Sequence, residues 1–331
     1  MLTMKFKSYI QTEQKPLKGL MLAEWAELIY LLFTLVIVMI TTTKLPNPEA
    51  MIWNRVRLLF VMAAMWLVYR LVPCRLTRAL RIFVELGLLA WWYPDTYSIN
   101  RIFPNLDHVV AAWDEQLFGF QPALVFAARF PSHIISELMD MGYVMYYPII
   151  VLVVLYYFVN RYEEFERCSF IILAGFFIYY VVFDLMPVAG PTFYYKAVGI
   201  SKIAHGVFPA IGDYFNTHTD CLPAPGYTNG IFYNLVEAAK ASGERPTAAF
   251  PSSHVGISTI CMLLALRTRN KKLWLPLLPI YLLLCMATVY IQAHYLIDAI
   301  AGFVSGVLLY AALLCMSRKI TNFAPQKERR R

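Results

Sequence analysis

Long apolar runs, separated by short polar or basic connections, dominate the chain. The eight runs occupy residues 22–40, 52–72, 78–93, 135–158, 168–188, 252–267, 272–291 and 294–316. Because a helix needs about twenty apolar residues to cross a bilayer core, most of these runs are long enough to span a membrane. The pattern predicts an all-α integral membrane protein with about eight transmembrane helices.

The composition agrees with this class. Of the 331 residues, 59% are hydrophobic and 15% are charged, which excludes an ordinary soluble domain. The six cysteines show neither a disulfide framework nor the Cys-x-x-Cys spacing of a zinc site. We therefore expect no metal and no other cofactor.

Lysine and arginine gather in the connections on one side of the predicted spans. The basic clusters fall at residues 70–81, at 267–272 and in the tail after residue 317. With eight spans, these clusters and the N-terminus share one side, which the positive-inside rule makes cytoplasmic. The clusters are short and lie at span ends, so the net charge of +8 indicates attraction to anionic lipid headgroups and no nucleic-acid partner.

Carboxylates also fall inside the predicted spans, where a charge is costly, and we single out Glu24, Glu27, Glu85 and Asp184. Glu24 and Glu27 lie near the start of the first span and can reach its polar edge. Glu85 and Asp184 lie deeper and need partners. A hydrogen-bonded contact between helices is the favoured interpretation, and a proton path is the alternative.

Candidate chemistry begins at the outer end of the sixth run. Ser252 and Ser253 follow a proline and precede His254, a sequence typical of a helix N-terminus. The free amides of such an N-terminus attract an anion, so His254 would lie beside a bound phosphate. Arg245 comes shortly before this motif and offers a planar fork suited to two phosphate oxygens.

The second part of the candidate site is His294, which Asp298 follows at a spacing of four. On a helix the two side chains share a face, so the carboxylate can accept from one imidazole nitrogen and leave the other as a nucleophile. Either motif alone is usually structural. Together they predict phosphoryl transfer through a covalent His294, with His254 as general acid.

At these residues the chain resembles the type 2 phosphatidic acid phosphatase superfamily. The motifs of that family read here as Arg-Pro at Arg245, Pro-Ser-Ser-His at Pro251 and His-x-x-x-Asp at His294. The resemblance implies lipid substrates and a six-helix lipid phosphatase-like catalytic core, formed by the last six spans. The first two spans would then be an addition to this core.

Two positions depart from the family pattern. The family lysine, seven residues before the Arg-Pro arginine, would fall on Ala238, so Lys240 is the nearest substitute in binding phosphate. The family arginine, six residues before the second histidine, falls on Thr288. Together with the segment MPVAGPTFYY at residues 186–195, these departures point to the inositol phosphoceramide synthase branch.

This branch resemblance implies a membrane lipid phosphotransferase, which moves a phospho-headgroup such as phosphoinositol from a phospholipid to a ceramide-like alcohol. Two alternatives stay open. One is a phosphatidic-acid-type phosphatase that hydrolyses a phosphomonoester, and the other is a non-catalytic transporter or scaffold of the same fold. The intact residues His254, His294 and Asp298 favour an enzyme over the second alternative.

We divide the chain into three parts. Residues 1–77 form a basic tail and two additional spans, residues 78–316 form the core, and residues 317–331 form a basic cytoplasmic tail. The core contains two long extracytoplasmic segments. Segment 94–134 predicts short helices lying on the membrane, and segment 189–250 predicts a lid or headgroup pocket.

The second long segment supplies further candidate residues. It leads to Arg245, and Tyr194, Tyr195 and Lys196 near its start are candidate substrate contacts. Because both histidines lie at the outer ends of their spans, we expect the active site to face the periplasm or a lumen. The N- and C-termini would lie in the cytoplasm.

Overall fold

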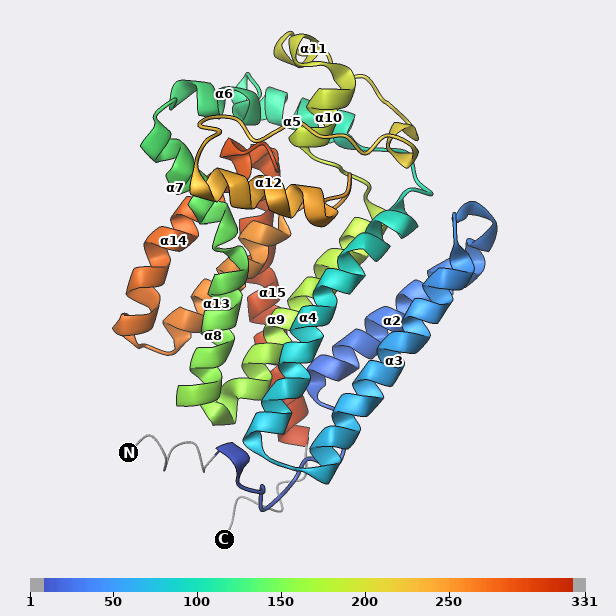
Figure 1. Cartoon of the computed structure of the whole chain (residues 1–331), viewed down its shortest axis with the longest axis vertical. Coiled ribbons are helices and arrows are strands. Elements are labelled where there is room, and N and C mark those ends of the chain that lie inside the picture. The colour runs from blue at the N-terminus through green and yellow to red at the C-terminus, as the bar shows by residue number, and fades with distance from the viewer. Residues whose placement is uncertain (1–8, 324–331) are drawn as a thin grey trace.

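The computed structural model describes residues 9–323 as a bundle of helices that is capped at one end (Figure 1). Within these residues the only β-type pairing is an isolated bridge between Thr12 and Cys74, so the predicted all-α class is confirmed. The helices are α2 (Leu22–Ile40), α3 (Pro48–Leu71), α4 (Arg75–Asn100), α5 (Asp107–Phe118), α6 (Pro122–Arg129), α7 (His133–Val144), α8 (Tyr146–Asn160), α9 (Tyr162–Leu185), α10 (Pro191–Val198), α11 (Ile200–Ala204), α12 (Ile231–Gly243), α13 (Ser253–Arg267), α14 (Lys271–Tyr290) and α15 (Leu296–Phe323). Two 3-10 turns, η1 (Thr42–Lys44) and η2 (Tyr214–Asn216), complete the set.

Every predicted span falls on a helix or on a pair of helices. Five helices, α2, α3, α9, α14 and α15, are long and apolar enough to cross a membrane. The pair α7 and α8, bent by 48°, raises this number to six, while α4 and α13 fall short of the same test. The protein is therefore an integral membrane protein, and the number of eight spans stays a prediction.

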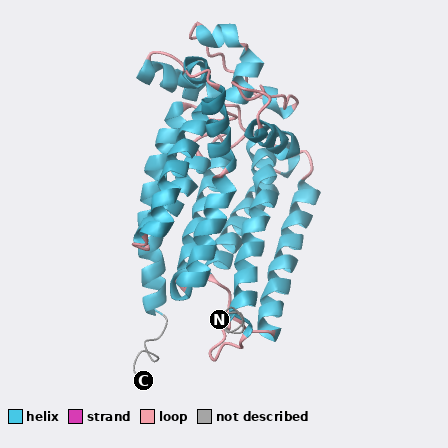
Figure 2. Cartoon of the chain, turned by 60° about the vertical axis from the view of Figure 1, so that its left-hand side comes forward, coloured by secondary structure: helices cyan, strands magenta, loops and turns pink. Residues whose placement is uncertain are grey.

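The two long connecting segments build the cap. Helices α5 and α6 come from the first segment, and α10, α11 and α12 come from the second, where irregular chain between α11 and α12 separates them. These five helices gather at one end of the bundle, above the long helices (Figures 1 and 2). The capped end is also where α13 and α15 begin, so the cap adjoins both predicted histidine motifs.

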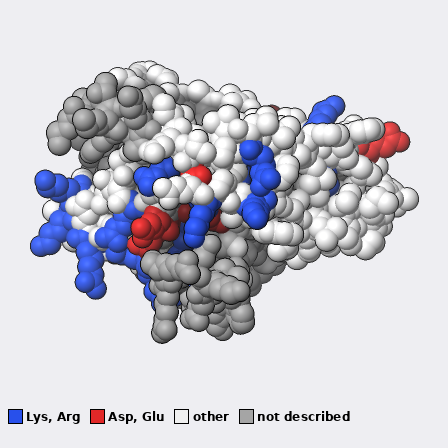
Figure 3. All heavy atoms as spheres, turned by 90° about the horizontal axis from the view of Figure 1, so that it is seen from below, with Lys and Arg blue, Asp and Glu red and all other residues white. Residues whose placement is uncertain are grey.

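The opposite end of the bundle is basic. Here α3 and α13 end and α4 and α14 begin, which brings the two internal arginine and lysine clusters of the sequence together. Lys and Arg side chains gather on this end with a smaller group of acidic ones (Figure 3). The outer parts of the two predicted basic tails, residues 1–8 and 324–331, lie outside the described residues.

Buried polar contacts fasten α2 and α3 to the rest of the bundle. The pairs are Glu24–Arg81, Glu27–Trp92, Tyr30–Asp184 and Arg55–Asp95. The Tyr30 hydroxyl donates to the Asp184 carboxylate at 3.1 Å, which is the kind of helix contact favoured for this residue. Removing one partner of such a buried pair leaves a charge or dipole unmatched, so these contacts specify how the additional helices dock.

The first turn of α13 packs very closely on α15. A methyl group added to Gly302 would lie 2.4 Å from the Ser252 carbonyl oxygen, and one added to Gly306 would lie 2.6 Å from the Gly256 carbonyl oxygen. Glycines spaced four apart on one helix face let two membrane helices approach backbone to backbone. This approach sets the position of His254 relative to the start of α15.

Candidate active site

His254 lies in the first turn of α13, whose start has the predicted capping chemistry. Ser252 is the N-cap, and its hydroxyl oxygen accepts from the Val255 amide at 3.3 Å. The Ser252 amide donates to the Asp298 carbonyl oxygen at 3.0 Å, so it is not available to a ligand. The amides of Ser253 and His254 have no acceptor in the described part of the chain, as expected for the first turn of a helix.

Two tyrosines enclose the His254 ring. Tyr143 stacks on it with ring centroids 4.8 Å apart, and Tyr146 lies at 4.4 Å in a tilted arrangement. Both come from the bent pair α7 and α8, far from His254 in sequence. The sequence analysis did not single them out, although tyrosines crowd this part of the fourth apolar run.

His294 lies in the turn between α14 and α15, two residues before the helix on which it was expected. Its Nδ1 is 2.8 Å from the Ala249 carbonyl oxygen and 3.5 Å from the Asp298 carboxylate. A carbonyl oxygen can only accept, so Nδ1 carries the proton and Nε2 is left without one. The Ala249 carbonyl is thus the nearer orienting group, and the predicted orienting residue, Asp298, lies farther from the same nitrogen.

The main hydrogen bond of the Asp298 carboxylate is to the backbone of the turn that carries His294. One of its carboxylate oxygens accepts from the Tyr295 amide at 2.8 Å, and this oxygen is also the one near His294. Burial lowers the pKa of the His294 imidazole to about 4, although the bond to Ala249 raises it. At neutral pH the ring is therefore uncharged, as a nucleophile must be.

The two histidines meet directly. His254 Nδ1 lies 3.3 Å from His294 Nε2, and the rings are set edge to face with centroids 5.4 Å apart. Because His294 Nε2 has no proton, His254 Nδ1 is the donor in this contact. The structure thus brings the predicted acid and the predicted nucleophile together across 40 residues of sequence.

Both histidines line a cavity of about 360 Å³ beneath α12. Most of its wall is aromatic or small, with side chains from α4, α8, α9 and the cap. Lys240, on α12, is the only lysine or arginine among the described residues that line it, and Ser253 lines it as well. The Lys240 ammonium pairs with Glu237 at 3.1 Å and donates to the Leu222 carbonyl oxygen at 3.3 Å.

Several other predicted residues do not line this cavity, Ser252 and Asp298 among them. Arg245 is exposed and lies outside the lining, because the chain is extended after α12 and the neighbouring Pro246 takes the buried side. Tyr194 and Tyr195 are fully buried, and their hydroxyls donate to the Pro209 carbonyl and to the Gln121 side chain. Lys196 is exposed at the end of α10 and is also absent from the lining.

Two carboxylates of α5 hold the His294 turn in place. Asp107 accepts from the Tyr295 hydroxyl at 3.0 Å and also from the amides of Ala189 and Gly190. Asp114 accepts from the amides of Leu296 and Ile297 at 3.1 and 2.9 Å, which caps the start of α15.

Burial raises the pKa of each of these two carboxyls to about 6, against the lowering effect of their hydrogen bonds. The sequence analysis gave neither residue a role in the site. Their spacing of seven, which places both on one face of a short helix, is the signal that could have marked them.

Comparison with known proteins agrees with this geometry. Residues 108–312 match the family described as the PAP2 superfamily. No curated protein and no solved structure matches the chain at a significant level. The family match spans more than half of the 331 residues and includes His254, His294 and Asp298, and on this basis the chain belongs to the PAP2 superfamily.

Proposed function

We propose that the protein is a lipid phosphotransferase, which moves a phospho-headgroup such as phosphoinositol from a phospholipid to a ceramide-like alcohol through a phosphohistidine on His294. Membership of the PAP2 superfamily supports a lipid phosphatase or phosphotransferase activity in general. The choice of transfer over hydrolysis rests on the charge of the cavity. A phosphatase that hydrolyses a phosphomonoester is the alternative.

The observation that carries the proposal is the single cation of the cavity. Lys240 is the only lysine or arginine of its described lining, and Glu244 in the same wall is acidic. Thr288, at the position of the family arginine, is buried, and its hydroxyl donates to the Cys285 carbonyl oxygen. A phosphomonoester carries close to two negative charges and a phosphodiester one, so a site with one cation favours the diester.

The proposed first step forms a bond from His294 Nε2 to the phosphorus of the donor and breaks the bond to its diacylglycerol oxygen. His254 acts in its imidazolium form, with a proton on each ring nitrogen; it gives its Nδ1 proton to that leaving oxygen and becomes neutral. In the second step the acceptor hydroxyl returns a proton to His254, its oxygen bonds to phosphorus, and the bond to His294 breaks. Lys240 and the first amides of α13 would stabilise the phosphoryl oxygens, so the scheme assigns no role to a metal or cofactor.

The geometry adds one requirement. In-line transfer places phosphorus and the leaving oxygen between the two rings, which needs roughly 6 Å from nitrogen to nitrogen. The observed separation is 3.3 Å, so the proposal includes a step in which the rings move apart. The Tyr143 and Tyr146 rings, with centroids 4.8 and 4.4 Å from that of His254, would have to accommodate this movement.

We further propose that the basic end of the bundle faces the cytoplasm and that the cavity faces the opposite side. The positive-inside rule supports this orientation, because the internal arginine and lysine clusters lie at the end remote from the histidines (Figure 3). The substrate would then enter from the leaflet next to the cap.

The orientation can be tested with single cysteines in a background without native cysteines. Ser201 in α11 and Lys272 in α14 are both exposed, at the capped and the basic end. On intact cells an impermeant maleimide should label Ser201→Cys, and Lys272→Cys should react only after permeabilisation. The opposite pattern would reverse the proposed orientation.

The contribution of Lys240 can be tested with Lys240→Met, which keeps the length of the side chain and removes its charge. Loss of a charge-assisted contact to phosphate should lower kcat/KM by roughly 10- to 100-fold. Lys202→Met, which removes an exposed charge from α11, is the matched control and should leave kcat/KM unchanged. If Lys240→Met keeps more than half of the wild-type kcat/KM, Lys240 does not bind the phosphoryl group.

The function itself is tested by competition between donors in reconstituted vesicles. One sample contains phosphatidic acid, and the other contains phosphatidylinositol with ceramide at the same surface concentration. We expect the headgroup to appear on ceramide, with release of diacylglycerol, and little phosphate from phosphatidic acid. His294→Ala serves as the inactive control. Phosphate release at least about tenfold faster than transfer, without a ceramide product, would establish the phosphatase alternative.

A further inference from the structure

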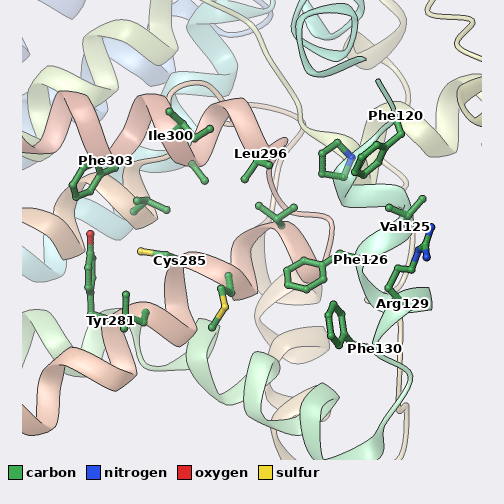
Figure 4. Close-up of a pocket in the computed structure, with 16 residues that line it drawn as sticks. Phe120, Val125, Phe126, Arg129, Phe130, Tyr281, Cys285, Leu296, Ile300 and Phe303 are labelled. Atoms are coloured by element: carbon green, nitrogen blue, oxygen red, sulfur yellow. The ribbon is translucent and has the colours of Figure 1, made fainter. Parts of the chain in front are cut away.

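A second hollow lies on the outer surface of the bundle, between α6, α14 and α15. Its volume is about 640 Å³, which is in the range of sites for small ligands. Side chains from all three helices face it, among them Phe126 of α6, Cys285 of α14, and Leu296 and Ile300 of α15, and Phe130 joins them directly after α6 (Figure 4). Apart from Arg129 and the Tyr281 hydroxyl, the lining consists of apolar or sulfur-containing side chains.

The groove lies between membrane-spanning helices, so a hydrocarbon chain of a lipid is the ligand that suits it. Both α14 and α15 are long and apolar enough to cross a membrane. Leu282 and Phe303, on the two sides of the groove, are 50% and 49% exposed, so its walls continue into the surface that faces the bilayer. A lipid chain that enters the groove fills space which no side chain of the described residues fills, and it gains dispersion contacts on several sides.

Arg129 gives one end of the groove a charge. It is the last residue of α6, it is exposed, and it lies at the edge of the lining beyond Phe126 and Phe130 (Figure 4). Within the described part of the chain it forms no ion pair with a carboxylate. Because α6 belongs to the cap, Arg129 lies at the level where lipid phosphates are expected, and its planar fork suits a phosphate group.

The groove is distinct from the catalytic cavity but adjoins it. Among the described residues, none lines both hollows. Val255 and Leu296 nevertheless line the groove, and they come one residue after His254 and two residues after His294. A chain bound in the groove would therefore pack against the backs of the two segments that carry the histidines.

We propose that this groove binds an anionic phospholipid, with an acyl chain between α14 and α15 and the phosphate on Arg129. The site is additional to the one at which the histidines act. It does not depend on the proposed transferase function, since binding can be measured on protein that is unable to turn over lipid.

The test uses the full-length His294→Ala protein in nanodiscs, so that no lipid is consumed. The probe is phosphatidylglycerol with a photoreactive group in one acyl chain, and labelled peptides are identified by mass spectrometry. We expect labelling of α14 and α15 around the groove that excess phosphatidylglycerol suppresses and phosphatidylcholine does not. Phe60 on α3, which is 71% exposed, reports the ordinary contact of lipid with the bundle and should be insensitive to either competitor.

Two variants decide the role of the charge. Arg129→Gln should reduce the labelling of the groove on the order of tenfold, because a charge-assisted contact to phosphate is lost. Lys202→Gln, which removes an exposed charge elsewhere on the cap, should leave it unchanged. Three results would each show ordinary bilayer contact only and overturn the proposal. These are equal labelling of the groove and Phe60, equal competition by the two lipids, and no effect of Arg129→Gln.

Discussion

The site depends on one hydrogen bond, from His294 Nδ1 to the Ala249 carbonyl oxygen at 2.8 Å. This bond fixes the tautomer, so that the unprotonated Nε2 faces His254. The carbonyl is itself held, because the Ala249 amide donates to the Val188 carbonyl oxygen at 2.9 Å. In a buried site such a chain of hydrogen bonds is rigid, and each member is costly to leave unpaired.

The cap and the bundle contribute different parts of this arrangement. Helix α5 supplies Asp107 and Asp114, which hold the turn before α15 and do not line the cavity. Close packing of α13 on α15 at Gly302 then sets the distance between the two histidine segments. The nucleophile is thus positioned by Ala249, which lines the cavity, and by the α5 carboxylates, which do not. Two separate hollows adjoin these two segments. The catalytic cavity is lined by the histidines, and the groove is lined by their neighbours in sequence.

The helices and part of the site could be predicted from local sequence, whereas the contacts that hold His294 could not. The helices and the cap of α13 follow from hydrophobic runs and Ser252, which are properties of neighbouring residues. The Ala249 carbonyl escapes such reasoning. Spacing alone can place the α5 carboxylates on one helix face, but it cannot identify what they bind, because Asp114 and Ile297 meet only in the folded chain, 183 residues apart. Arg245 was predicted from its motif, but its exposure depends on how the chain leaves α12. Lys240, proposed only as a substitute, is the residue that lines the cavity.

In the proposed mechanism His294 carries the headgroup between donor and acceptor. The most direct measurement incubates the purified protein with phosphatidylinositol in the absence of acceptor, stops the reaction in alkali, which preserves phosphorus–nitrogen bonds, and maps the adduct by mass spectrometry. We expect phosphoinositol on the peptide that contains His294, and its loss when ceramide is added before the quench. An adduct on another residue, or continued transfer to ceramide by His294→Ala protein, would contradict it.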